Sequence, residues 1–139
     1  GHDSLQLATG SYNVAVGDNT LNKTTTGQFN VAIGHAVLED NTTGSSNLGV
    51  GISALANNIN GGSNTAVGNN ALETMTGGSN NTAIGPSAMR YATGGGGNFA
   101  LGVNALNANA GGNNNVGIGN TSLLFNTTGS SNVGIGNNT

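Results

Sequence analysis

The chain contains no cysteine, no tryptophan and a single proline, Pro86. Without cysteine it cannot form a disulfide-stapled domain or a cysteine-ligated zinc site. Charge is scarce as well, with two basic and five acidic residues and a formal net charge of −3. A nucleic-acid interface needs a cluster of basic side chains to replace phosphate counterions. Lys23 and Arg90 do not form such a cluster, so we expect no nucleic-acid partner.

Long hydrophobic runs are missing too. No stretch approaches the roughly 18 apolar residues of a membrane span, so we expect no membrane insertion by this segment. No signal peptide stands at the beginning. Because the chain opens on Gly1-His2, we interpret residues 1–8 as an N-terminal tag remnant or a partial coil, and 9–139 as one domain.

Small residues, most of them polar, make up the larger part of the chain instead. The chain has 26 glycines, 26 asparagines, 16 threonines and 11 serines, which together make 79 of its 139 residues. Such a composition resembles that of disordered chains, but these are rarely so poor in charge, lysine, glutamate and proline. Order must therefore come from a pattern in the sequence.

That pattern is a strict tandem repeat. The motif Asn-x-Ala/Gly-Val/Ile/Leu-Gly occurs eight times without an insertion, and its leading asparagines recur with a constant 17-residue period. A second glycine column, which begins at Gly10, and a Leu/Met column, which begins at Leu21, have the same period. The asparagines of the motif are Asn13, Asn30, Asn47, Asn64, Asn81, Asn98, Asn115 and Asn132.

A short, fixed period is typical of a solenoid, in which each repeat is one coil stacked on the next. This period is too short for a helical hairpin or a leucine-rich repeat. We therefore predict an all-β fold, a parallel β-roll or β-solenoid of about eight 17-residue coils. Each coil would contain two short strands and two tight turns. The motif would form the first strand, and the Ala-Leu segment (as in Ala71-Leu72) would form the second strand or a single helical turn.

The columns of the repeat have distinct expected roles. All-glycine columns mark corners that need a positive φ or have no room for a Cβ atom. The asparagines are expected to stack as a hydrogen-bonded ladder. Every charged residue of the repeats falls in the columns of Asp18, of Glu39 and of Lys23, which also hold most of the sequence variety. These variable columns should form the outside of the coil.

A 17-residue coil has little interior, and it cannot easily enclose both a Val/Ile ridge and a leucine column. A ridge left exposed along a rod is a surface for self-association. Rotational symmetry lets identical ridges meet at one axis, and three-fold geometry suits three narrow rods with one ridge each. We therefore expect a homo-oligomer, and a homotrimer is the arrangement that this geometry suits.

The repeat resembles the YadA-type head repeats of trimeric autotransporter adhesins. The segments Asn64-Thr65-Ala66-Val67-Gly68-Asn69-Asn70-Ala71-Leu72 and 81–89 carry the resemblance most clearly, and it covers about residues 9–139. The same repeat is seen in some phage tail fibres and bacterial surface proteins. The resemblance implies a left-handed, trimeric β-roll used for attachment. The period of this chain is uniform, whereas many repeats of the family are shorter and mixed in length.

No set of residues suggests catalysis. Glu39 and Asp40 are adjacent, but one coil away their columns hold Lys23, Ala56 and Asn57, so no further acid would converge with them in a cleft. His35 would lie one coil from Asp18, which is too small a set for a structural metal. We therefore predict no enzyme activity, no catalytic residue, no metal and no cofactor. Ligand-binding residues, if present, are expected in the variable columns at positions such as His35, Tyr91 and Phe125.

These observations favour an extracellular attachment module, the head or fibre segment of a bacterial surface adhesin or of a virion fibre. Its partners would be further copies of the chain and a host-surface protein or glycan. The alternative is a structural filament or phage tail-fibre segment that assembles by lateral or end-to-end stacking of coils. An enzyme of the β-solenoid type is disfavoured by the small number of carboxylates.

Overall fold

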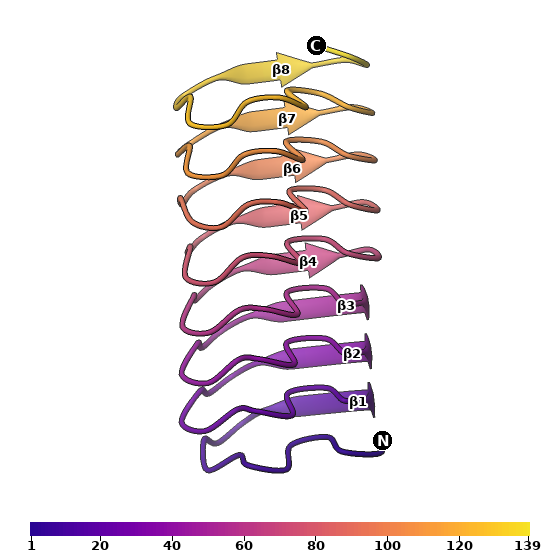
Figure 1. Ribbon diagram of the computed structural model, residues 1–139, viewed down its shortest axis with the longest axis vertical. Coiled ribbons are helices and arrows are strands. Elements are labelled where there is room, and N and C mark those ends of the chain that lie inside the picture. The colour runs from indigo at the N-terminus through magenta and orange to yellow at the C-terminus, as the bar shows by residue number, and fades with distance from the viewer.

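The computed structural model describes residues 1–139 as an all-β chain without a helix, so no helix is present that could cross a membrane. Eight short strands lie one above another in a single parallel sheet, in chain order (Figure 1). The predicted parallel β-solenoid is therefore confirmed. The strands are β1 (Val14–Asp18), β2 (Val31–His35), β3 (Leu48–Ile52), β4 (Thr65–Val67), β5 (Thr82–Ile84), β6 (Phe99–Leu101), β7 (Val116–Ile118) and β8 (Val133–Ile135).

The register of the sheet follows the sequence repeat. Val14 pairs with Val31, and every later pair of strands keeps the offset of one sequence repeat. We number each coil after its strand and count positions 1 to 17 from the motif asparagine, so that coil 1 is 13–29 and coil 8 is 132–139. A side chain at one position thus lies above the same position of the preceding coil.

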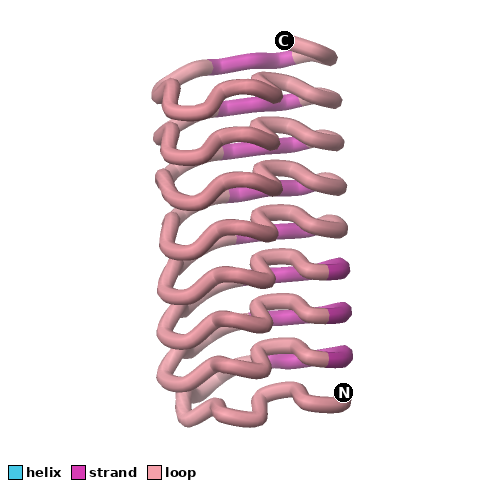
Figure 2. Tube along the Cα trace, viewed as in Figure 1, coloured by secondary structure: helices cyan, strands magenta, loops and turns pink.

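Each coil contains one strand, not the two that the sequence predicts. The Ala-Leu segment at positions 8 and 9 forms turns, and the strands occupy one side of the coil only (Figure 2). Leu72 has a φ of 52° and Asn70, two residues earlier, a φ of 59°. These angles are incompatible with an extended strand. The segment is nevertheless tied to the next coil, because the Leu38 amide donates to the Ala54 carbonyl at 3.1 Å.

The interior is a single layer of side chains between the sheet and this turn segment. Leucine or methionine at position 9 points inward and meets the small residue at position 3, as Leu106 and Gly117 illustrate. A Cβ atom on Gly117 would lie 3.0 Å from Leu106 Cγ, so the leucine fills the space and position 3 must remain small. Burial of a leucine stabilises by about 1.5–3 kcal/mol, which offsets the roughly 1–2 kcal/mol cost of its left-handed backbone.

The two glycine columns have the two predicted causes. At position 5 all eight glycines have a φ between 125° and 136°. A Cβ atom on Gly68 would also lie 2.6 Å from the Gly85 carbonyl oxygen of the next coil. At position 15 the cause is space, since a Cβ atom on Gly61 would lie 2.4 Å from Asn58 Oδ1. Both columns therefore serve the backbone and the polar interior.

The first residues of the chain lie against coil 1. The Asn19 amide donates to the His2 carbonyl at 3.0 Å, and the Leu5 amide donates to the Thr20 carbonyl at 3.2 Å. Leu5 is partly buried and packs against the core. The hydrogen bonding between coils thus extends to the segment before the first motif.

Candidate binding surface

The asparagines at position 1 form the expected ladder. The Asn47 amide and its Nδ2 both donate to Asn30 Oδ1, at 3.0 and 3.1 Å. Asn47 Nδ2 also donates to the Gly61 carbonyl at 2.8 Å, which closes its own coil. The side-chain amide is buried and fully used within the stack. This column is therefore structural and offers no group to a ligand.

A second buried ladder, which the motif does not predict, runs along position 12. Asn58 Nδ2 donates to Asn41 Oδ1 at 2.8 Å, and Asn126 Nδ2 donates to Asn109 Oδ1 at 3.1 Å. Met75 and Ala92 interrupt the column, so Asn58 Oδ1 is buried without a hydrogen-bond partner. Alignment of position 12 at the repeat period would have revealed four asparagines in seven coils.

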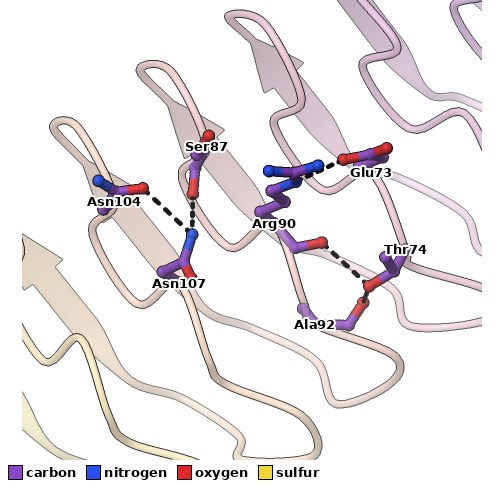
Figure 3. Close-up of polar contacts among 7 residues, drawn as sticks. All are labelled: Glu73, Thr74, Ser87, Arg90, Ala92, Asn104 and Asn107. Carbon is purple, nitrogen blue, oxygen red and sulfur yellow. Dashed lines mark hydrogen bonds and ion pairs between the residues drawn. The ribbon is translucent and has the colours of Figure 1, made fainter.

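The charged residues of the repeats lie on the outside as predicted, and two pairs of opposite charge join adjacent coils. Lys23 Nζ lies 2.6 Å from Asp40 Oδ1, and Arg90 Nε lies 2.6 Å from Glu73 Oε2 (Figure 3). The hydrogen bond and charge of Asp40 raise the pKa of Lys23, and Glu73 does the same for the pKa of Arg90. Both pairs lie at the surface, where water screens the attraction, so they add little to stability.

The polar contacts around Arg90 also tie the outer loops together. The single Thr74 hydroxyl proton is shared between the carbonyls of Arg90 and Ala92 in the next coil, which lie 2.9 and 3.0 Å from Oγ1. Asn107 Nδ2 donates to the Ser87 carbonyl of the preceding coil at 2.8 Å (Figure 3). The side chains of this surface thus fasten one coil to the next, and they do not converge on an external point.

The three residues predicted as ligand contacts are exposed but do not form one site. His35 ends β2, and its Nε2 lies 3.7 Å from Asp18 Oδ2, with both side chains about half exposed. Tyr91 belongs to coil 5, where the Arg90 guanidinium lies 5.1 Å from its ring centroid. Phe125 belongs to coil 7 and is 83% exposed. His35 belongs to coil 2 and Tyr91 to coil 5, so the two are far apart along the rod. Tyr91 and Phe125 share a column, but Ala108 of coil 6 lies between them.

The hollow at the C-terminal coil has a volume of about 460 Å³. It is open to solvent and lies between positions 7 to 12 of coil 7 and the residues of coil 8. No charged side chain lines it, and it offers no acid, base or nucleophile beyond hydroxyl groups. Its walls include Leu123, Phe125, Asn126, Asn132 and Thr139.

The outer face of the sheet carries an exposed apolar stripe. Positions 2 and 4 point away from the core, and most of them are Val, Ile, Leu or Phe. Val16 is 54% exposed and Ile33 40%, and at the other end Ile135 is 68% exposed. No charged residue occurs at positions 12 to 17 or 1 to 5 of any coil. The Val/Ile ridge therefore lies outside and the leucine column inside.

A pair of stacked aromatic rings, which the repeat motif does not predict, flanks this stripe. Tyr12 and Phe29 occupy position 17 of successive coils, with ring centroids 4.9 Å apart and planes 7° apart. Their exposed fractions are 74% and 55%. The spacing of the two aromatic residues by one repeat period was the available signal.

No three histidine, aspartate or glutamate side chains come together in a way that could hold a metal ion. The geometry defines a parallel β-solenoid with an uncharged, apolar sheet face, an uncharged interior of stacked leucine and asparagine columns, and charges confined to other columns. Comparison with protein-family models, with curated proteins and with solved structures finds no match.

Proposed function

We propose that this chain is an extracellular attachment module that assembles as a homotrimer through the outer face of its sheet. The single observation that carries the proposal is the apolar stripe at positions 2 and 4, which is accessible to solvent in every coil and free of charge. A contiguous apolar surface of this kind marks an interaction site. Each rod has only one such stripe, so a rotational axis lets all copies bury it at once.

The resemblance to YadA-type head repeats supplies the biological setting of this proposal, which is a bacterial surface or virion fibre, and the left-handed sense of the coil. In a trimer joined by the sheet faces, the columns with His35, Tyr91 and Phe125 would remain outside. Contacts from these columns would be weak individually and multiplied by three copies. This arrangement suits adhesion to a host-surface protein or glycan, and it requires no enzymatic group.

The test replaces Val67 and Ile84, which are neighbours on the outer face of β4 and β5, by aspartate. The core residues Ala66 and Ala83 are unchanged, so the coil should still fold. Two charges placed in a dry contact cost several kcal/mol unless they are paired. We expect sedimentation to show a trimer for the parent and a folded monomer for Val67→Asp/Ile84→Asp.

The matched control is Glu39→Gln/Glu73→Gln, which changes two charges on the outside and should leave the trimer intact. Circular dichroism verifies that each variant retains its β structure. A parent protein that sediments as a stable monomer would contradict the proposal. Long unbranched fibres in electron micrographs of the parent would instead support the filament alternative.

A further inference from the structure

We infer that Tyr12 and Phe29 form a platform that binds the sugar ring of a neutral oligosaccharide. This inference names a ligand class for the proposed attachment function and rests on that function for its biological meaning. Its first support is the backbone. Tyr12 has a φ of 64° and Phe29 a φ of 58°, values that are unusual for bulky residues.

Elsewhere in this fold, a bulky residue with a positive φ is compensated by burial. Leu21 and Leu38 have a φ near 50° and are fully buried in the core. Tyr12 and Phe29 gain no such burial, because both rings are mostly exposed. The other six coils place only serine, asparagine or glycine at this position. Backbone strain without a packing benefit is typical of functional positions.

The second support is the shape of the stack. The rings are nearly parallel, and the next coil carries Ser46 at the same position. No third ring therefore extends the stack, and one face of Phe29 has no aromatic neighbour. An aromatic face is electron-rich and attracts groups with partial positive charge. The C–H groups on one face of a pyranose ring carry such charge and match the ring in size and flatness.

The third support is the set of polar groups beside the rings. Tyr12 carries a hydroxyl group, Gln28 immediately precedes Phe29 in the chain, and Ser46 occupies the position of Phe29 in the next coil. They offer both donors and acceptors, and a few such groups around an apolar surface fix the orientation of a ligand. The columns on this side of the coil hold no charge. An uncharged sugar therefore fits better than a sialylated or sulfated one.

The experiment compares two double variants with the parent chain. Tyr12→Ser/Phe29→Ser installs the residue that coils 2 and 3 already carry at this position, so it should fold at least as stably as the parent. Ile59→Thr/Ala110→Thr is the control, since it changes two side chains of a column outside the proposed sites to the threonine that the other coils carry there. Cellohexaose, maltohexaose and chitohexaose serve as probes in isothermal titration.

We expect the parent to bind at least one of these probes and Tyr12→Ser/Phe29→Ser to bind it at least about tenfold more weakly. The control should bind with unchanged affinity. Failure of the parent to bind any of the three probes, or equal losses in both variants, would overturn the inference. A change of sedimentation in Tyr12→Ser/Phe29→Ser would also overturn it, because the rings would then contact a second copy.

The same sedimentation runs keep this inference separate from the proposed trimer. A parent chain that binds the sugar but sediments as a monomer would refute the trimer and retain the platform. A parent chain that is trimeric but binds no sugar would refute the platform and retain the trimer.

Discussion

At the scale of single residues, backbone conformation constrains this fold more than side-chain chemistry does. Each complete coil needs a position-5 glycine with a φ of 125° to 136°, and it also holds residues with a positive φ at positions 7, 9 and 17. The leucine at position 9 tolerates this angle because it is buried. A solenoid repeats these backbone conformations in each coil, since the same position meets the same neighbours each time.

Gly68 provides the sharpest test at this scale. Gly68→Val would combine a φ of 136° with a β-branched side chain, and its Cβ would lie 2.6 Å from the Gly85 carbonyl oxygen. We expect a loss of stability of several kcal/mol and damage to the adjoining coils. Thermal unfolding followed by circular dichroism measures the effect.

Asn69→Ala, one residue later, is the control for this prediction. Asn69 lies in the variable column of Asp18, which the sequence places on the outside, so the sequence alone predicts an unchanged stability. The structure predicts a small loss, because Asn69 Oδ1 accepts a hydrogen bond from the Ile52 amide at 3.2 Å. This exposed bond should contribute about 0.5–1 kcal/mol. Equal melting points for the two variants would refute the backbone requirement at Gly68.

At the scale of the structural element, stacked columns replace secondary structure as the unit of stability. The ladder at position 1 is continuous through all coils, whereas the ladder at position 12 is broken at Met75 and Ala92. The break follows from the absence of side-chain amides in these two residues. A large residue next to a small one keeps the interior filled, but it leaves Asn58 Oδ1 without a donor.

Repair of this ladder should stabilise the protein only when both residues change. In Met75→Asn/Ala92→Asn the column becomes continuous from Asn41 to Asn126, and Asn58 Oδ1 gains a donor. A buried unsatisfied group costs about 1–3 kcal/mol, so we expect a gain of about 1 kcal/mol. Urea denaturation measures this difference.

The single variant Met75→Asn is the control. Its new Oδ1 would face Ala92 and lack a donor, so the break would only move by one coil. The single variant should therefore not be more stable than the parent. A stabilisation of the single variant equal to that of the double variant would contradict the ladder account.

At the scale of the whole molecule, the scarcity of charged residues determines which interactions stabilise the protein. No charged side chain is buried, and the two closest ion pairs lie at the surface. Stability therefore depends on hydrogen-bond ladders and apolar burial, which salt screens only weakly. The one extended apolar surface is the outer face of the sheet, and it dictates how copies can associate.

The melting temperature should accordingly stay nearly constant between about pH 5 and about pH 9, and between low and high salt. The two shifted groups, Lys23 and Arg90, have a raised pKa. Their contributions are thus fully present below their ordinary pKa values and fade only as the pH rises through the raised ones. Calorimetric scans across this range check the prediction, and a steep change of melting temperature between these pH values would contradict it.

The repeat, its register and the outside of the coil all follow from the order of the amino acids. A fixed period places identical residues above one another, so Val14 had to pair with Val31. Stacked asparagines form a ladder for the same reason, and glycine at position 5 signals a backbone that no other residue adopts easily. Columns that tolerate charge must face water. Each conclusion depends only on comparison of one coil with the next.

The arrangement within one coil depends instead on tertiary packing. The repeat period does not show which apolar column points inward. Alternation along the motif defines two faces of the strand, but it does not say which face is buried and which is exposed. Packing places Leu72 inside and Val67 outside, and the positive φ of Leu72 turns the expected second strand into a turn. The contact of Tyr12 with Phe29 likewise arises only once the coil has closed, because closure fixes the direction of each side chain and the distance between neighbouring coils.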